Sequence, residues 1–399
     1  MTTLISFLGR GTWVDSTRGY RSIAYRFADG ATTQQTPYFG VALAEHLQAD
    51  RLIIAGTSGS MWDVLLADQS DEDGKLFDAV VDADLVAAVA GDKVTASMLA
   101  QLEPLVATRL GRAATLALIP YCRTDAEQIC VLTSVAALTC PGETIVLDVT
   151  HGFRHLPMLA LVAARYLSHV RGAAVTDIYY GALDMARDGV APVISLAGLM
   201  SMLDWVEALA TYEKDGDYGS FAPLLAKDGM DAAAAAALSR AAFHERTTAT
   251  EKARERLTSA LDSVARHTGA AGALFRDELE RRISWFRRPT RHERELALGR
   301  AYLARGDYLR AAVFLLEGVV TRLLYDRKLN PSDFTERKDA LEELRSRGED
   351  VKLLADVRNA MAHGLRSSDV RINKLLSDEA ALAAMLQRLA DAFTRDSHS

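Results

Sequence analysis

The sequence is poor in the residues that mark disulfide-stapled, metal-bound or membrane-spanning proteins. Its 399 residues include only three cysteines, Cys122, Cys130 and Cys140, with no CxxC pair and no histidine at a metal-ligand spacing. We therefore expect no disulfide framework and no metal site, and a cytoplasmic location where thiols stay reduced. No run of about 18 apolar residues predicts a transmembrane helix. The first residues also lack the basic segment of a signal peptide, so we expect no membrane partner.

An excess of positive charge is missing as well. The 46 Lys and Arg residues are outnumbered by 53 Asp and Glu, which gives a net charge of -7. A uniformly basic nucleic-acid-binding surface is therefore excluded, and any role with nucleic acid needs a local basic patch. Apolar residues are present in an ordinary share of 49%, which over this length suffices for two or three domains with cores of their own.

The first half of the chain alternates strand-like and helix-like segments. Six short runs rich in Ile, Val, Leu or Tyr are apolar over almost their whole length, which is typical of strands in a parallel sheet covered on both faces. They lie at Leu4–Leu8, Leu52–Ala55, Thr115–Ile119, Ile145–Val149, Asp177–Tyr180 and Val193–Leu196. Helical patterns separate them at Tyr38–Leu47, Thr95–Leu110, Asp125–Leu138 and Leu156–Val170. This order predicts a Rossmann-like, doubly wound α/β domain with a parallel-rich sheet over residues 1–195.

The second half contains amphipathic helical patterns and no strand that we can identify. The clearest helices are expected at Leu199–Tyr212, Glu251–Arg266, Leu296–Leu303, Leu309–Leu324 and Lys338–Arg347. Glycine and proline breakers separate these segments, and Pro289 is placed to start a helical subdomain. We predict a helical linker region over residues 196–290 and an all-α domain over residues 291–399.

Three loops after predicted strands carry residues suited to a phosphate-bearing ligand. In a doubly wound sheet, ligands bind beyond the carboxyl ends of the strands, and glycines, hydroxyls and arginines there favour phosphate. The candidate ligand-binding residues are Gly9, Arg10, Gly11 and Thr12 in the first loop, Thr57, Ser58, Gly59 and Ser60 in the second, and Thr150, His151, Gly152, Phe153 and Arg154 in the third. The first loop lacks a full GxGxxG, which argues against an ordinary dinucleotide site.

Each loop also has a purely structural interpretation. Gly9 and Gly11 can be simple turn glycines, and the hydroxyls from Thr57 to Ser60 can cap a helix. The run from His151 to Arg154, between a strand and a helix that begins near Pro157, favours a functional role. Asp148, at the end of its strand, is better explained as an organiser of the loop than as a metal ligand.

A second candidate site is the segment Arg358-Asn359-Ala360-Met361-Ala362-His363. Positions five apart on a helix lie about 140° apart, so one regular helix cannot direct Arg358 and His363 at the same point. A two-fold dimer would instead gather two arginines and two histidines around one pocket. As a bare pattern this spacing is weak, because a surface arginine and a histidine near a helix end before Gly364 would look the same.

These residue types suit metal-independent cleavage of RNA, whose 2'-hydroxyl is an internal nucleophile next to its own phosphate. His363 can transfer protons near neutral pH, and Arg358 can stabilise charge that develops on the phosphate oxygens. Asn359 can orient either the histidine or the phosphate. The expected products carry a 2',3'-cyclic phosphate and a 5'-hydroxyl.

A basic cluster precedes the all-α domain, with Trp285 and Phe286 inside it. Its arginines are Arg276, Arg281, Arg282, Arg287, Arg288, Arg291 and Arg294. The cluster can follow an RNA backbone and stack a base. Four interleaved acidic residues favour the alternative, a salt-bridged face toward solvent.

These motifs together resemble the CARF–HEPN ribonucleases, ancillary effectors of type III CRISPR systems. The N-terminal half carries the resemblance in FLGRGTW, GTSGSMWDVL, DVTHGFRHLPML and DIYYGALD, and the C-terminal half in RGDYLRAAVFLLEGVVTRLL and VRNAMAHG. The resemblance spans most of the chain, though residues 215–290 contribute little. It implies a CARF sensor fold followed by an all-α HEPN domain.

The resemblance also implies a function. The strand-end loops would bind a cyclic oligoadenylate, with four adenylates favoured by resemblance alone, across a homodimer or a higher homo-oligomer. The ring would be an allosteric activator and not a cofactor, and it would switch on cleavage of single-stranded RNA by Arg358, Asn359 and His363.

Two alternatives stay open. A non-catalytic cyclic oligoadenylate sensor or partner-binding module would bind the ring without nuclease activity. A toxin-like enzyme on the same helical scaffold would leave modified RNA ends and not cut ones.

Overall fold

The computed structural model describes residues 1–14, 19–66, 79–152, 155–364 and 367–395. The chain divides into two compact units, Met1–Ser201 and Met202–Ser399, which we describe separately. The helix α6 (Ala197–Asp215) begins in the first unit and ends in the second. The predicted further division of the helical half at residue 290 stays a prediction.

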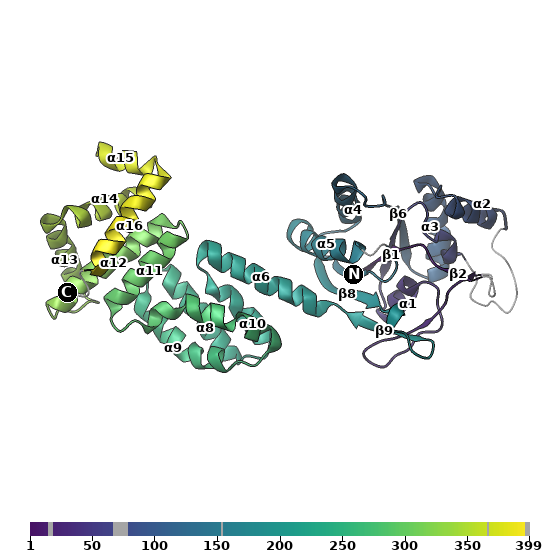
Figure 1. The fold of residues 1–399 in the computed structure, drawn as a ribbon, viewed down its shortest axis with the longest axis horizontal. Helices are drawn as coiled ribbons and strands as arrows, with labels where there is room; N and C mark the ends of the chain where they lie inside the picture. Colours follow the sequence, from purple (N-terminus) through teal and green to yellow (C-terminus); the bar gives the residue numbers. More distant parts are fainter. Residues whose placement is uncertain (15–18, 67–78, 153–154, 365–366, 396–399) are drawn as a thin grey trace. The chain divides into compact units, whose positions relative to one another are not determined.

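The first unit is an α/β domain built on one large sheet (Figure 1). Its strands are β1 (Thr2–Leu8), β2 (Trp13–Val14), β3 (Gly19–Tyr20), β4 (Ala24–Arg26), β5 (Arg51–Gly56), β6 (Ala113–Leu118), β7 (Thr144–Asp148), β8 (Ala174–Gly181) and β9 (Val190–Ser195). Its helices are α1 (Phe39–His46), α2 (Ala79–Ala90), α3 (Ala96–Leu110), α4 (Asp125–Ala137) and α5 (Leu156–Arg171), with 3-10 turns at Trp62–Leu65 and Leu183–Met185.

The sheet has the order β4-β9-β8-β7-β1-β5-β6. Every neighbouring pair is parallel except β8 and β9, which are antiparallel. All six strands expected from the sequence are present, so the prediction of a Rossmann-like, parallel-rich sheet is confirmed. The chain order reverses beside β1, between β5 on one side and β7 on the other. This switch point is where a doubly wound sheet opens a crevice for ligands.

Both faces of the sheet are buried, as the continuous apolar runs predicted. Successive residues of β1 point to opposite faces. Leu4 and Leu8 pack into a core with α1, α2 and α3, whereas Ile5 and Phe7 pack into a second core with α4 and α5. The two layers of helices hold the strand ends rigidly at one edge of the sheet.

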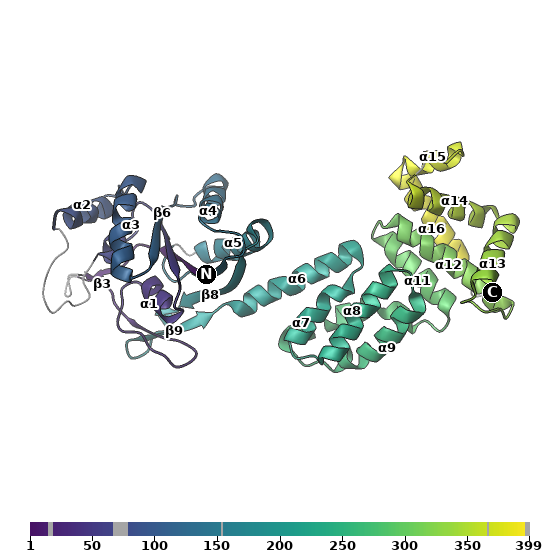
Figure 2. The ribbon, with the colours of Figure 1, turned by 180° about the vertical axis from the view of Figure 1, so that it is seen from behind.

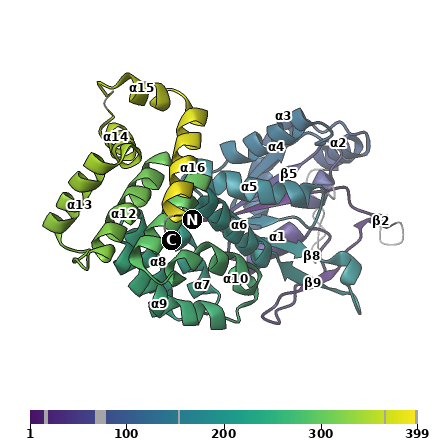
Figure 3. The ribbon, with the colours of Figure 1, turned by 60° about the vertical axis from the view of Figure 1, so that its left-hand side comes forward.

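The second unit is all-helical in its described residues (Figures 2 and 3). After α6 its helices are α7 (Ala222–Lys227), α8 (Ala232–Arg246), α9 (Thr250–Arg266), α10 (Ala270–Arg282), α11 (Arg291–Ala304), α12 (Tyr308–Asp326), α13 (Phe334–Arg347), α14 (Glu349–His363), α15 (Val370–Leu376) and α16 (Glu379–Arg395). Two 3-10 turns lie at Tyr218–Phe221 and Ser284–Arg287. An all-helical region after an α/β domain is the predicted fold class.

The centre of this unit is the hairpin of α11 and α12. A Cβ atom on Gly299 would lie 2.8 Å from the side chain of Leu315, and one on Gly318 would lie 2.8 Å from that of Leu296. Glycine at both positions therefore lets the two helices pack at close range. The helix α14 packs on α12, and α16 packs on both helices of the hairpin. Within the described ranges, no helix is both long enough and apolar enough to cross a membrane.

Candidate functional site

The three predicted ligand loops meet at the carboxyl ends of β1, β5 and β7. A Cβ atom on Gly9 would lie 2.4 Å from the backbone nitrogen of Gly152, so the first and third loops touch through glycine backbones. The amide of Met61, just after the second loop, donates to the carbonyl of Gly9 at 2.9 Å. Position 9 therefore has to be glycine because any side chain there would clash with the backbone of Gly152, and not only because the chain turns at this point.

The second loop uses two of its hydroxyls to build itself. The Ser60 hydroxyl donates to the Leu8 carbonyl at 2.6 Å and accepts from the Thr57 amide at 2.8 Å. Thr57 and Ser60 are both buried, and the Trp62 indole donates to the Thr57 carbonyl at 2.8 Å. The Ser58 hydroxyl is half-buried and lies 3.3 Å from the Tyr121 hydroxyl. Ser58 is therefore the hydroxyl of this loop that is best placed to reach a ligand.

The remaining residues of the first two loops surround an exposed arginine. The Arg10 guanidinium lies 3.3 Å from an Asp92 carboxylate oxygen, and its side chain is 64% exposed. A Cβ atom on Gly59 would collide with that same carboxylate. Gly11 lies against the Met61 sulfur and leaves it room, and Thr12 is exposed. Arg10 can therefore swing to an anionic ligand at little cost, because its present partner is also exposed to solvent.

Asp148 organises the third loop, as the sequence indicated. Its two carboxylate oxygens accept hydrogen bonds from the Thr150 amide at 2.9 Å and from the Ser6 hydroxyl at 2.5 Å, and Ser6 accepts in turn from Tyr38 at 2.6 Å. The Thr150 hydroxyl accepts from the Gly181 amide at 2.7 Å, which ties the loop to β8. Complete burial raises the pKa of Asp148 to about 6, although the hydrogen bonds from Ser6 and Thr150 act in the opposite direction and lower it.

His151 holds the start of α1. Its Nε2 atom accepts a hydrogen bond at 3.1 Å from the amide of Phe39, the first residue of that helix. Desolvation lowers the pKa of His151 to about 4, so at neutral pH the ring is neutral and its proton is on Nδ1. The side chain therefore caps a helix from within the predicted ligand loop. Phe153 and Arg154, also predicted as ligand-binding residues, lie outside the described residues.

These two pKa shifts predict opposite effects of pH on the stability of the α/β unit. Asp148 holds its proton in the folded state up to about pH 6, so its contribution to stability falls as pH rises from about 4 to 6. His151 resists protonation down to about pH 4, so its contribution falls as pH drops from 6.5 to about 4. Each residue changes the free energy of unfolding by about 3 kcal/mol over its pH range. Because the two changes have opposite signs, the pH dependence of the wild type is nearly flat.

Substituting each residue in turn separates the two contributions. Amide hydrogen exchange in β1 and β7, corrected for the effect of pH on the intrinsic exchange rate, measures the free energy of unfolding of the sheet. Between pH 7 and 4.5, the His151→Asn protein should gain stability relative to the wild type, and the Asp148→Asn protein should lose it. Equal pH slopes in all three proteins would contradict both assignments.

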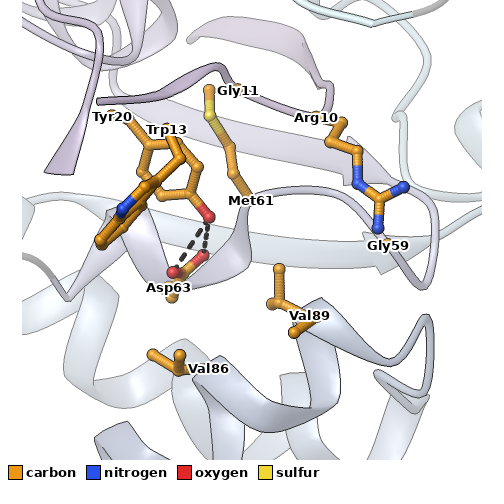
Figure 4. Close-up of a pocket in the computed structure, with 10 residues that line it drawn as sticks. Arg10, Gly11, Trp13, Tyr20, Gly59, Met61, Asp63, Val86 and Val89 are labelled. Carbon is orange, nitrogen blue, oxygen red and sulfur yellow. Dashed lines mark hydrogen bonds between the residues drawn. The ribbon is translucent and has the colours of Figure 1, made fainter. Parts of the chain in front are cut away.

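A cavity of 310 Å³ opens beside the first two loops (Figure 4). It is lined by Arg10, Gly11, Trp13, Tyr20, Gly59, Met61, Asp63, Val86, Val89 and Ala90. The rings of Trp13 and Tyr20 meet edge to face, 5.4 Å apart between centroids. The Tyr20 hydroxyl donates to Asp63 at 2.7 Å, and its burial together with Asp63 raises the pKa of Tyr20.

The cavity has two chemically different ends. The aromatic rings, Asp63 and Val86 lie at one end, Arg10 lies at the other, and Met61 and Val89 lie between them (Figure 4). Trp13 is 53% exposed, although an exposed tryptophan is unusual without a partner. A flat heterocycle with a phosphate attached matches both ends. Sequence reasoning found Arg10, Gly11 and Gly59 but missed the rest, although Trp13 lies only one residue beyond the first loop.

The second candidate site lies at the C-terminal end of α14. Acidic residues in its first turn favour the start of the helix, and Gly364 ends it in the left-handed conformation with φ of 61°. Val351, Leu354 and Val357 bury one face of α14. Arg358 and Asn359 are half-buried, and His363 is exposed in the last turn.

The structure does not bring Arg358 and His363 together within one chain. The helix continues without interruption to His363, so the two side chains lie about 140° apart around its axis. Asp356 lies on the same face as Asn359 and His363 by helical spacing. Its carboxylate accepts a hydrogen bond at 2.6 Å from Arg345 of α13.

The fold and the first site define a Rossmann-like domain with a cavity beside its strand ends, joined to a helical region. Residues 3–183 match the family model of the CARF domain of the CRISPR system endoribonuclease Csx1. The N-terminal α/β unit of this chain is therefore a domain of the CARF type, similar to that of Csx1.

A curated relative supports this assignment. The CRISPR-associated protein MJ1674 of Methanocaldococcus jannaschii is 25% identical over 252 residues. The similarity covers 58% of this chain and 39% of the relative. The chain thus spans about two fifths of the length of the relative that it matches.

Proposed function

We propose that this chain is a ribonuclease gated by a cyclic oligoadenylate. One observation carries the proposal: a Csx1-type CARF domain is joined to a helical region in which α14 ends on Arg358, Asn359 and His363. The family model is named for an endoribonuclease, and the helical region supplies the arginine and histidine that metal-independent cleavage of RNA requires. We assign this region to the HEPN type.

The activator is a ring of adenylates, with four favoured, held by the loops at the strand ends. The cavity in Figure 4 is the proposed place for one base and its phosphate, with Trp13 beside the base and Arg10 near the phosphate. A two-fold ring bound across two copies of the domain contacts both subunits alike. It can shift the protein to the active arrangement only by binding that arrangement more tightly.

The active form is a homodimer. On α5 the outward side chains of Met158, Val162 and Val170, spaced four and eight residues apart, are each more than half exposed. The opposite face of α5 packs on the sheet through Ala160 and Leu167. An apolar stripe of this kind is typical of a surface that a second copy covers.

Cleavage needs only the groups that the dimer gathers. The 2'-oxygen of the RNA attacks its neighbouring phosphorus, the bond from phosphorus to the 5'-oxygen breaks, and a 2',3'-cyclic phosphate and a 5'-hydroxyl remain. His363 transfers the proton, Arg358 stabilises the negative charge on the phosphate oxygens, and Asn359 orients one of them.

A non-catalytic sensor is the second candidate function. The wide angle between Arg358 and His363 on one regular helix favours it, because α14 of a single chain does not bring these two side chains together. Cleavage of single-stranded RNA in EDTA, with and without a cyclic oligoadenylate, separates the two functions. Mass spectrometry of the products distinguishes cyclic-phosphate ends from the modified ends that an RNA-modifying enzyme would leave.

A further inference from the structure

A cavity in the helical unit is lined with arginines that lie outside both sites described above. It measures 480 Å³, within the range of small-molecule sites. Its lining residues come from α6, α10, the Ser284–Arg287 turn and its flank, and α11. The cationic ones are Arg281, Arg282, Arg288 and Arg305, and we call the space the arginine cavity.

Most arginines of the basic cluster seen in the sequence are neutralised by ion pairs. Five of its seven arginines pair with carboxylates, at Arg281, Arg282, Arg287, Arg291 and Arg294. Trp285 and Phe286 are buried and present no exposed ring face for stacking. Five of the seven arginines are therefore salt-bridged, as that interpretation expected, although Arg294 is buried and does not face solvent. Arg276 and Arg288 have no ion pair among the described residues.

Arg288 and Arg305 have no carboxylate partner for their guanidinium groups within hydrogen-bond or ion-pair distance in the described part of the chain. Arg281 and Arg282 share Glu278, and Arg282 also bonds Glu213 at 2.6 Å. Glu213 and Glu278 are the carboxylates that bond these four arginines, while Glu245 and Glu293 act on Arg305 and Arg288 only at longer range. The guanidinium groups of Arg288 and Arg305 therefore have no ion-pair partner in the described residues and are open to an anion that enters the cavity.

Of these two arginines, Arg305 is held in position by its side chain and Arg288 by its backbone alone. Arg305 donates to the Tyr212 hydroxyl and lies over the Tyr212 ring, 4.5 Å from its centroid, which leaves further N–H donors for a ligand. The backbone carbonyl of Arg288 accepts from buried Arg294 at 2.8 Å, and Arg294 is fixed by Glu251 at 2.7 Å. The Arg305 guanidinium is therefore preorganised and loses less entropy on binding than a free one.

The rest of the lining suits an organic group attached to the anion. Ala297, Ala301 and Ala304 share one face of α11 and form a smooth, nonpolar wall. The Ser284 hydroxyl and Tyr212 add polar groups near the arginines. Guanidinium groups recognise phosphate oxygens through paired hydrogen bonds, and the alanine wall leaves space for a sugar or base.

We propose that the arginine cavity is a binding site for a nucleotide phosphate, separate from the activator loops and from the α14 motif. The inference does not depend on the proposed ribonuclease activity. Arg288 and Arg305 bind the phosphate, and the base or ribose lies on the alanine wall of α11.

Calorimetric titration of the full chain with uridine 5'-monophosphate tests this proposal, since a uracil probe avoids an adenine-selective site. Uridine 5'-monophosphate should bind, and uridine without its phosphate should not. Inorganic phosphate should compete. The Arg288→Ala change should weaken binding by roughly tenfold to a hundredfold, as the loss of a charge-assisted hydrogen bond implies.

Three controls keep the result specific. Arg287→Ala should bind normally, because Arg287 is adjacent in sequence, pairs with Glu280 and does not line the cavity. Arg10→Ala should also bind normally, because Arg10 belongs to the other unit. Arg305→Gln should weaken binding like Arg288→Ala, and the exposed Arg288 supplies the test if the Arg305 variant does not fold.

Four results would overturn the proposal. They are no binding of uridine 5'-monophosphate, equal binding of uridine, loss of binding in the Arg10 variant alone, and binding only of a hexa-uridylate strand. The last result would indicate an RNA-backbone surface in place of a nucleotide site. RNA cleavage by the same proteins is measured separately, so failure here leaves the ribonuclease proposal intact.

Discussion

The His363→Ala protein is expected to lose RNA cleavage by about 10²- to 10⁴-fold and to bind the activator unchanged. This range is the usual contribution of a positioned proton-transfer group. His363 is exposed in the last turn of α14, so its removal leaves the core packing and the stability of the fold nearly intact. The rate of cleavage under single-turnover conditions measures the effect.

Arg358 should behave in the same way, with one informative difference. Arg358→Ala removes the charge, whereas Arg358→Lys keeps the charge and loses the paired hydrogen bonds, so the lysine variant should retain part of the activity. Lys352→Ala is the matched control, since Lys352 is exposed on the same helix more than one turn from the motif. If both Arg358→Ala and His363→Ala cleave RNA at the wild-type rate, α14 is not part of the active site.

Mixing two inactive variants is expected to restore activity if the site is shared between subunits. A dimer with one Arg358→Ala and one His363→Ala subunit retains one arginine and one histidine at the two-fold axis. After subunit exchange, the mixture should cleave RNA at least about tenfold faster than either variant alone, because proton transfer and charge stabilisation are both present again.

The control mixes the Arg358→Ala protein with the Arg358→Ala/His363→Ala double variant. No dimer in this mixture has an arginine at position 358. That mixture should stay inactive. If the first mixture is also no faster than its components, the two subunits do not share one functional pair, and the site must be built in another way.

The large elements of the fold could be predicted because their strands are buried on both faces. Runs such as Leu4–Leu8 and Ile145–Val149 are continuous in apolar residues for this reason, and each became a central strand. The strand β4 has only three residues and β2 has two, too few for any periodic signal. The antiparallel pairing of β9 likewise left no distinct pattern, because it depends on the path of the chain after β8.

The candidate site could be predicted only in part. Sequence position puts Gly9, Thr57 and Thr150 at strand ends, because parallel strands end at one edge of the sheet. It does not show where each hydroxyl points, and Ser60 and Thr150 use theirs within the protein. The cavity walls come from segments far apart in the sequence, such as Trp13 and Val86, which only the folded chain brings together.

Cleavage of a single-stranded RNA in EDTA, with a panel of cyclic oligoadenylates of different ring sizes, tests the central claim most directly. We predict slow or undetectable cleavage without a ring. With one ring size, most simply four adenylates, we predict rapid cleavage in EDTA to 2',3'-cyclic phosphate ends, abolished by His363→Ala. No cleavage with any ring, or cleavage that proceeds equally without one, would contradict the account of a ring-gated ribonuclease.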